Sequence, residues 1–488
     1  MQAAGRDYIV HMNPSYNITQ SDDKLNSEIC RRARLARDPR FDGEFFVAVK
    51  TTGIYCRSIC PARPPIEKNV LYFKNTAQAA KGGFRPCLRC RPESAPNSPA
   101  WRGTSTTVQR ALDLIQTGAL NGEPLESLAN RLGVGERYLR KLFKQEVGVS
   151  PLAVAQNERL LFAKKLLVET DLAMTDVAFS SGFGSVRRFN SALRESFGLT
   201  PGDLRSKRKS ADNYTDITLQ LHYRPPYDWA GVIGFFARHA LQGIETVDAN
   251  SYQRNIVVDG LPGQIRVSPI AGRHALQLTL RLPTPGHLMP IAARVRKMFD
   301  LNANPAVIHE AFENDLVLAR LAIITPGIRS PVQWSIYESG VRAIVGQQVS
   351  IRAARNVSAR LVAATGEASG AFPSPGAISC LDDSHFPMPT RRRDTLREFC
   401  RLSAKSETPL QLDSFAQLKG IGPWTTAMVA MRGYGDPDVF PPGDLGLIKA
   451  YEALKTKTDD GQTLKQNIES WRPWRSYAAN LLWRSLSV

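Results

Sequence analysis

The sequence predicts a multidomain α+β protein, and three observations lead to this fold class. The 488 residues provide enough chain for three or four domains, each with its own core. Helical periodicity extends from about residue 104 to residue 208, apolar and polar residues alternate as in strands from residue 216, and helical periodicity returns from about residue 290. Four of the seven cysteines gather between Thr51 and Pro92, which predicts a small unit held by a metal ion.

Composition argues against a membrane protein. Hydrophobic residues make up 43% of the chain, as in globular proteins, and no run approaches roughly eighteen uninterrupted apolar residues. No charged and then apolar leader opens the chain, so we expect a cytoplasmic protein that does not bind membranes. The net charge of +18 is concentrated in residues 1–210, which hold 33 Lys and Arg against 20 Asp and Glu. This predicts a polyanion-binding first part, although a basic balance is also compatible with solubility alone.

The amino-terminal cysteines form two closely spaced pairs. Three residues separate Cys56 from Cys60 and two separate Cys87 from Cys90, a spacing typical of a tetrahedral four-thiolate Zn²⁺ site. By spacing alone, a purely structural zinc site is favoured over a reactive one. A disulfide framework has less support, because no signal peptide is present and the remaining cysteines are scattered: Cys30, Cys380 and Cys400.

The residues around these cysteines favour a reactive site. The segments FFVAVKTTGIYCRSIC and GFRPCLRC closely resemble the metal-binding methyl-acceptor domain of the Ada family, which we place at residues 1–92. The resemblance implies that Cys56 accepts a methyl group from a DNA phosphotriester, with Cys60, Cys87 and Cys90 completing the metal shell. It also suggests three DNA-contact candidates nearby: Thr52, Arg63 and Arg85.

This ligand set suits methyl transfer. Zinc keeps Cys56 deprotonated, while four thiolates leave the site with two net negative charges and the sulfur electron-rich. Methylation removes one of these negative charges, and a less negative site repels phosphate less. We therefore expect repair to be followed by tighter binding to promoter DNA.

An internal repeat organises residues 104–208, after a linker predicted at about 92–103. Ala129 and Gly133 lie four apart in LESLANRLGVGERYLRKLFKQEVG, as do Ala178 and Gly182 in MTDVAFSSGFGSVRRFNSALRESFG. In a helix-turn-helix the small alanine lets two helices approach and the glycine takes the turn conformation. The two copies, the bridging NERLLFAKKLLVET and the closing FNSALRESFGLTPGDLR resemble the AraC-type DNA-binding domain.

The AraC resemblance implies recognition helices that begin near Glu136 and Ser185. Arginine can read guanine in the major groove, yet for any single arginine a phosphate contact or a solvated charge is favoured. The candidates are Arg137, Arg140, Lys141 and Lys144 in the first helix and Ser185, Arg187 and Arg188 in the second. We expect a monomer that binds double-stranded DNA, both alkylated and promoter, and has RNA polymerase as a partner. The tract RSKRKSADN is predicted to be a second linker.

Residues 213–290 are predicted to form a mixed α+β domain. Strands are expected in ITLQLHY, YQRNIVVDG, QIRVSPI and HALQLTLRL, and a helix around DWAGVIGFFARHALQG. The segments RPPYDW, GFFARHA and ETVDANSYQR resemble the amino-terminal domain of AlkA-type 3-methyladenine DNA glycosylases. We identify no chemistry in this region, because its histidines are scattered and structural roles are favoured for them: His222, His239, His274 and His287.

Residues 291–488 are predicted to be mostly helical. The sequence LKGIG between two helices predicts a helix-hairpin-helix, in which Gly420 and Gly422 let backbone N–H groups point at a phosphate. Asp444 follows 22 residues after Gly422. This spacing, the GDLGL context and the closing SWRPWRSYAANLLW resemble the helix-hairpin-helix glycosylases, which implies that Asp444 is the catalytic aspartate. On its own, an aspartate in a Pro/Gly loop is favoured as a turn residue or helix cap.

The same resemblance implies a base pocket. Cutting an N-glycosidic bond places positive charge on the sugar, which a carboxylate stabilises, and the base must first be flipped from the stack. Trp424 and Trp483 fall on the pocket's aromatic positions, although core roles for them are nearly as well supported. Trp424 also occupies the position of the lysine of strand-nicking relatives, which implies a monofunctional enzyme. Gln348 replaces the intercalating leucine, and Met428 replaces a tyrosine.

Together these resemblances predict a fused alkylation-damage protein: a zinc methyl acceptor, an AraC-type transcription activator and an alkylpurine glycosylase. The PCHR motif of the second Ada methyltransferase does not occur in the sequence. The alternative is a DNA-binding transcription regulator whose glycosylase half is catalytically silent and only anchors or scans DNA.

Overall fold

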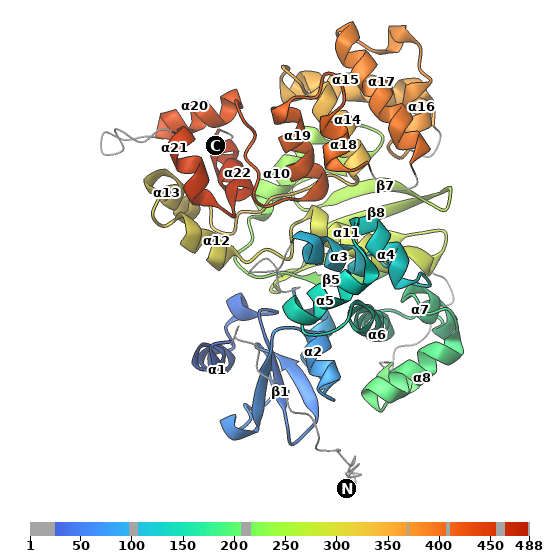
Figure 1. The fold of residues 1–488 in the computed structure, drawn as a ribbon, viewed down its shortest axis with the longest axis vertical. Coiled ribbons are helices and arrows are strands. Elements are labelled where there is room, and N and C mark those ends of the chain that lie inside the picture. Colours follow the sequence, from blue (N-terminus) through green and yellow to red (C-terminus); the bar gives the residue numbers. More distant parts are fainter. Residues whose placement is uncertain are drawn as a thin grey trace.

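The computed structural model describes residues 25–96, 106–205, 216–367, 370–406, 410–454 and 464–486. The predicted polar leader, most of the predicted 92–103 linker and nearly all of the RSKRKSADN tract lie outside the described residues. Four groups of elements follow one another along the chain (Figure 1). They are a small sheet with its helices, an all-helical unit, a larger sheet and a second helical region, as the predicted fold class requires.

The first group is a small sheet between two helices. Its elements are α1 (Ser27–Ala36), β1 (Phe46–Val49), β2 (Ile54–Arg57), β3 (Val70–Phe73), α2 (Thr76–Lys81) and β4 (Arg85–Pro86). The strand order is β3-β1-β2-β4, with β1 antiparallel to both neighbours and β4 parallel to β2. Phe45 and Val47 are buried with residues of α1, whereas Phe46 and Ala48 are buried with residues of α2. Burial on both faces explains why this stretch is continuously apolar.

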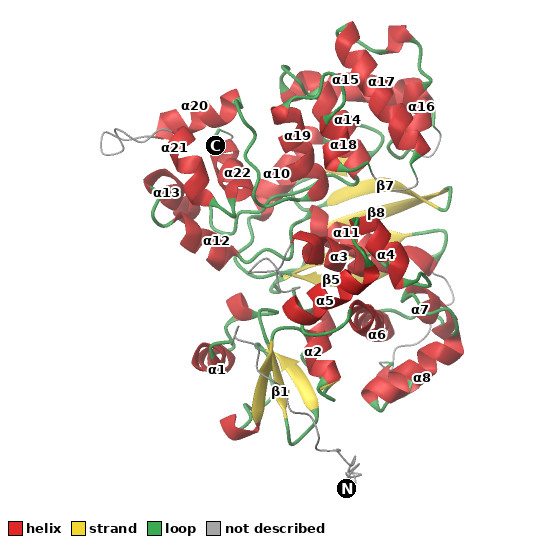
Figure 2. Ribbon diagram, in the orientation of Figure 1, coloured by secondary structure: helices red, strands yellow, loops and turns green. Residues whose placement is uncertain are grey.

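The second group contains the two predicted helix-turn-helix motifs. Its helices are α3 (Thr106–Gln116), α4 (Leu125–Leu132), α5 (Glu136–Glu146), α6 (Pro151–Glu169), α7 (Met174–Ser180), α8 (Val186–Phe197) and α9 (Pro201–Leu204). Gly133 and Gly182 have left-handed φ values of 71° and 82°, which favour glycine. Ala129 and Ala178 are buried. The motifs are therefore α4–α5 and α7–α8, joined by the long helix α6 (Figure 2).

The third group is an antiparallel five-stranded sheet with the order β5-β9-β8-β7-β6. Its elements are β5 (Ile217–His222), α10 (Trp229–His239), β6 (Glu245–Val247), β7 (Tyr252–Val258), β8 (Leu261–Pro269) and β9 (Ala275–Arg281). The four predicted strands and the helix are present. The short strand β6 was not predicted, because three residues are too few for a periodicity signal.

The fourth group forms two helical lobes with separate hydrophobic clusters (Figure 1). Its helices are α11 (Leu288–Met298), α12 (Pro305–Phe312), α13 (Leu316–Ile324), α14 (Ile336–Val345), α15 (Ile351–Thr365), α16 (Pro375–Ser379), α17 (Thr390–Lys405), α18 (Leu412–Ala416), α19 (Pro423–Val429), α20 (Leu445–Leu454), α21 (Leu464–Asn467) and α22 (Arg475–Ser485). One lobe is built from α14 to α19, and the other from α12, α13 and α20 to α22. No helix in the described part of the chain is long and apolar enough to cross a bilayer.

The groups are packed together through buried contacts. The core of the second helix-turn-helix motif is continuous with that of the large sheet, so these two parts do not have the separate cores expected from the sequence. Lys165 of α6 donates a hydrogen bond to the Gln220 carbonyl of β5 at 2.5 Å. The fully buried Arg224 donates to the Asp42 carbonyl of the first group at 2.7 Å and to the Asn302 carbonyl of the fourth at 2.6 Å.

Candidate active sites

Four sulfur atoms meet at one end of the small sheet. Cys56 lies on β2, Cys60 follows in the turn after it, and Cys87 and Cys90 follow β4. Their Sγ atoms all lie within 4.8 Å of one another. A tetrahedral zinc ion with Zn–S bonds of about 2.3 Å spaces its sulfurs about 3.8 Å apart. The donor set and its size therefore fit Zn²⁺.

The four thiols are close enough to change one another's ionisation. The Arg57 N–H donates to Cys90 Sγ at 3.3 Å. Hydrogen bonding with Cys56 lowers the pKa of Cys60 to about 7, whereas hydrogen bonding with Cys60, followed by that with Cys87, raises the pKa of Cys56. Neighbouring thiolates repel one another, so all four ionise together only when a cation balances their charge.

The two pairs differ in exposure. Cys87 and Cys90 are 8% and 7% exposed, while Cys56 and Cys60 are partly exposed. A bulky electrophile attached to DNA can therefore approach the first pair more easily than the second. Arg57, directly after Cys56, is buried and pairs with the buried Asp42, so this arginine points into the protein and not toward a ligand outside.

The other DNA-contact candidates of this unit lie at its surface, in segments close in sequence to the cysteines. Thr52 is exposed in the turn between β1 and β2, and Arg63 is exposed in the segment after Cys60. Arg85 is partly exposed on β4, where its N–H donates to the Gly53 carbonyl at 2.8 Å. These three side chains thus come from the segments that surround the cysteines.

The candidate DNA-reading residues lie on α5 and α8 and are mostly exposed. On α5 the exposed side chains are Arg137, Arg140, Lys141 and Lys144, and on α8 they are Arg187 and Arg188. Arg140 pairs with Glu136 at 2.5 Å, so its charge is partly neutralised in the free protein. Ser185 has a structural role, because its hydroxyl caps α8 by accepting a hydrogen bond from the Arg188 N–H at 3.2 Å.

The Asp444 carboxylate is held between two indole rings. Trp424 Nε1–H donates to Asp444 Oδ2 at 2.9 Å, and Trp483 Nε1–H donates to Oδ1 at 3.3 Å. The Leu447 N–H also donates to Oδ1, at 3.0 Å, so the aspartate caps α20 as the residue type alone suggests. Both tryptophans are partly exposed, and Trp483 also packs against the core of one helical lobe. The structure brings together three residues that lie on α19, before α20 and on α22.

These three residues line a cavity of about 540 Å³ between the two helical lobes and α10. Helix α10 contributes Phe235, Arg238 and His239, although sequence reasoning found no chemistry in that region. The Arg432 guanidinium lies 4.5 Å from the Phe235 ring centroid and 5.4 Å from that of Trp483. The pattern of a single helix cannot reveal this wall, because its partners lie about 200 residues further along the chain.

The predicted hairpin between α18 and α19 is braced from two sides. Gln347 Nε2 donates to the Gly420 carbonyl at 3.0 Å, and the Thr395 hydroxyl donates to the Lys419 carbonyl at 2.7 Å. Gly420 has a φ of 94°, and an added Cβ would lie 2.3 Å from Thr395 Oγ1. Gly422 has an ordinary φ of −109° and open space around its missing side chain. The structure thus requires glycine at the first position, and leaves room beside the second.

The position expected to hold an intercalating side chain is exposed. Gln348 lies in the loop between α14 and α15 with a left-handed φ of 55°. Its neighbours Val349 and Ile351 are 40% and 48% exposed. Met428, on α19, lines the same cavity as Asp444.

Three family models match the chain. The metal-binding domain of Ada matches residues 29–93, a helix-turn-helix domain matches residues 128–207, and the AlkA N-terminal domain matches residues 218–335. With the four-thiol cluster, the first of these matches establishes Zn²⁺ as the cofactor. The fold and these matches define a DNA-binding protein that combines a zinc unit, a helix-turn-helix unit and a glycosylase-type unit.

The relatives narrow this class to one family. The chain is 38% identical over 94% of its length to the "Probable bifunctional transcriptional activator/DNA repair enzyme AlkA" of Mycobacterium tuberculosis, and covers 96% of it. It therefore belongs to the family of that protein. It is also 30% identical to DNA-3-methyladenine glycosylase 2 of Escherichia coli, over 54% of this chain and 95% of that one. The bifunctional enzyme AdaA of Bacillus subtilis is 32% identical, over 38% of this chain and 84% of that one.

Proposed function

We propose that this protein repairs alkylated DNA by two chemistries and activates transcription. Its carboxyl-terminal half is a monofunctional 3-methyladenine DNA glycosylase, and its zinc unit accepts methyl groups from phosphotriesters in a single turnover. The observation that carries the proposal is the Asp444 carboxylate, held by Trp424 and Trp483 at a cavity large enough for one flipped base. Family membership supports both activities.

Glycosidic cleavage transfers charge from the base to the sugar. When the bond between C1′ and the base nitrogen breaks, its electron pair goes to the alkylated purine, which loses its positive charge. The sugar becomes oxocarbenium-like, and the Asp444 carboxylate stabilises it by electrostatic attraction. Water then adds to C1′ and releases a proton. Two indole N–H groups and the Leu447 N–H hold the carboxylate in one orientation, so little reorganisation is needed during the reaction.

The aromatic groups have a second role. The rings of Trp424, Trp483 and Phe235 offer faces on which a flipped, electron-poor base can stack. Trp424 stands where a nucleophilic lysine would be needed for strand cleavage, and an indole cannot form a Schiff base. We therefore infer base release without nicking of the resulting abasic site.

Methyl transfer at the zinc unit uses the partly exposed Cys56. Its Sγ attacks the methyl carbon of a phosphotriester, the carbon–oxygen bond breaks, and the electron pair stays on the phosphate oxygen. The products are a thioether and an ordinary phosphodiester. Bound zinc keeps the sulfur ionised at neutral pH and is held by Cys56, Cys60, Cys87 and Cys90. A thioether does not readily give the methyl group back, so each protein molecule acts once.

We infer that the helix-turn-helix unit binds promoter DNA, and we propose that the protein acts there as a monomer with RNA polymerase as a partner. In each motif the second helix, α5 or α8, carries exposed basic residues, as does a helix that enters the major groove. Loss of one negative charge at Cys56 raises promoter affinity, and added salt reduces this gain. Fluorescence anisotropy of methylated and unmethylated protein on promoter DNA tests the switch, and equal affinities at low salt contradict it.

The decisive experiment is a base-release assay. The full-length protein is incubated with methylated duplex DNA, and free bases and strand breaks are counted separately. We expect release of 3-methyladenine without nicking. Tight DNA binding with no released base would instead favour a regulator whose glycosylase half is silent.

A further inference from the structure

A histidine at the end of α10 lines the candidate base cavity. His239 is the last residue of this helix, and it shares the cavity with Asp444, Trp424 and Trp483. Its side chain is partly exposed, as are those of its neighbours Arg238 and Ala240. The imidazole stacks at a tilt on Phe235, with 4.5 Å between the ring centroids.

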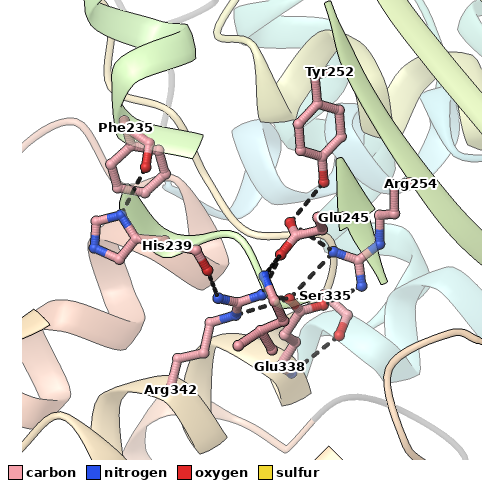
Figure 3. A network of polar contacts seen from close by, with 9 residues as sticks. Phe235, His239, Glu245, Tyr252, Arg254, Ser335, Glu338 and Arg342 are labelled. Carbon is pink, nitrogen blue, oxygen red and sulfur yellow. Dashed lines mark hydrogen bonds and ion pairs between the residues drawn. The ribbon is translucent and has the colours of Figure 1, made fainter. Parts of the chain in front are cut away.

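Hydrogen bonding determines which nitrogen of His239 carries the proton. Nδ1 lies 2.8 Å from the Phe235 carbonyl oxygen (Figure 3). A carbonyl oxygen only accepts hydrogen bonds, so Nδ1 must be the donor. Burial, together with the positive charges of Arg342, Arg432 and Arg238, lowers the pKa of His239 to about 3. At neutral pH the ring is therefore uncharged, and Nε2 carries a lone pair on the side away from that carbonyl.

A buried network holds this end of α10 in place. Arg342 donates to the His239 carbonyl at 2.5 Å and pairs with Glu245 at 2.8 Å and Glu338 at 2.6 Å. Glu338 also pairs with Arg254 at 2.5 Å (Figure 3). The network joins β6, β7 and α14 to the end of α10. The orientation of the imidazole is thus supported by both the mixed domain and the helical lobe.

Most of the charged side chains along the cavity wall are hydrogen-bond donors. The arginines of the wall are Arg238, Arg329, Arg342, Arg355, Arg432 and Arg484. Of the two carboxylates, Asp444 accepts from two indoles and Asp228 lies 3.4 Å from Arg484 and accepts from the Gly231 N–H. His239 Nε2 has no hydrogen-bond partner among the described residues, and so it presents an acceptor to a ligand.

We propose that His239 Nε2 accepts a hydrogen bond from the exocyclic amine of a flipped adenine and thereby makes this glycosylase prefer alkylated adenine to alkylated guanine. With the sugar beside Asp444, the six-membered edge of a purine points away from that carboxylate, toward the rest of the cavity. Adenine carries an amine donor at position 6, whereas guanine carries a carbonyl acceptor there. An acceptor opposite a carbonyl leaves both groups without a partner. This inference rests on the proposed glycosylase activity.

The test compares two lesions that differ at this position. Full-length protein acts on methylated duplex DNA, and the release rates of 3-methyladenine and 3-methylguanine are measured in one reaction. In His239→Leu, we expect release of 3-methyladenine to fall about tenfold, as for the loss of one hydrogen bond, with release of 3-methylguanine nearly unchanged. In His239→Arg, a donor replaces the acceptor and the preference shifts toward guanine. His274→Leu, the same change at an exposed histidine, serves as the matched control.

The possible outcomes separate the two proposals. If wild-type protein releases neither base, the glycosylase proposal fails. If wild-type protein is active but His239→Leu slows both bases equally, or leaves their ratio unchanged, His239 does not read position 6. Because release of both bases is measured in the same tube, the ratio of the two rates does not depend on the fraction of folded protein. An unchanged preference in His239→Arg would also overturn the inference.

Discussion

At the scale of single residues, Asp444 combines a structural and a chemical role. It caps α20, which is the ordinary role of such a residue, and it also receives two indole N–H groups at the cavity. Asp444→Asn keeps the size of the side chain but removes its negative charge. We expect base release to fall roughly 10²-fold or more, while affinity for alkylated duplex changes little. Base-release kinetics and a gel-shift titration measure the two effects.

The neighbouring Asp438 provides a matched control for Asp444. Its carboxylate pairs with Arg472 at 2.6 Å and Arg475 at 2.7 Å, so it is already neutralised by partners of its own. Asp438→Asn should therefore leave the rate of base release within a few fold of wild type. Excision by Asp444→Asn at the wild-type rate would show that another carboxylate, with Asp436 and Asp438 nearest in sequence, carries the chemistry.

Substitutions of Cys56 and Cys90 are expected to have different effects, although both residues belong to one cluster. Cys56→Ala removes the partly exposed nucleophile, so methyl uptake from phosphotriesters should be lost while base excision persists. Cys90→Ala removes a buried ligand, so the zinc unit should lose its metal and unfold. Transfer of a radiolabelled methyl group and zinc content distinguish the two variants. Loss of both activities in Cys56→Ala would show that the sites are coupled.

At the scale of elements, the hairpin between α18 and α19 contains two glycines with different constraints. Gly420→Ala places a Cβ 2.3 Å from Thr395 Oγ1 in a left-handed conformation, so it should lower the stability by about 1–3 kcal/mol. In Gly422→Ala the added Cβ meets no protein atom within 4 Å, so the melting temperature should stay unchanged. We expect its affinity for duplex DNA to fall, because the new methyl group lies where the hairpin is proposed to contact a phosphate. Thermal melts and DNA titrations of both variants check this. If Gly422→Ala and wild type bind duplex DNA with equal affinity, this hairpin is not part of the DNA interface.

At the scale of the whole molecule, the zinc unit and the glycosylase half are joined by Arg224. This fully buried side chain has two acceptors in the zinc unit, the Asp42 carbonyl and the Glu44 carboxylate, and one in the glycosylase half, the Asn302 carbonyl. Because the zinc unit needs its metal to fold, chelation removes two of these acceptors and leaves the guanidinium in need of partners. We expect a chelator to lower the melting temperature of the glycosylase half as well as that of the zinc unit.

Two variants test this coupling. Arg224→Met removes from the glycosylase half the buried charge that is paired with the zinc unit. Chelation should therefore leave the unfolding transition of the glycosylase half unchanged in calorimetry. Arg281→Met is the matched control, because Arg281 is 65% exposed and its pair with Asp216 contributes little. If chelation leaves the melting temperature of the glycosylase half unchanged in wild-type protein, the two halves unfold independently.

The sequence by itself determined the features that have a local signal. The cysteine spacing, the Ala/Gly repeat and the strand alternation each depend on a few neighbouring residues, and the structure has the elements they predict. The motif around Gly420, Gly422 and Asp444 was likewise visible, because hairpins and caps are set by short-range backbone geometry. What these motifs do chemically came from resemblance to known families and not from spacing alone.

Only the tertiary structure decided which residues and elements face one another. No local pattern could reveal that two indoles hold Asp444, that α10 closes the cavity, or that the second helix-turn-helix motif shares its core with the large sheet. His239 illustrates the limit, because one histidine on an amphipathic helix carries no periodic signal. Its tautomer depends on a carbonyl one turn away, and its pKa depends on burial and on arginines from α14 and the segment after α19. Such contacts join different elements of the chain, and their energies depend on burial that arises only once the domains have packed.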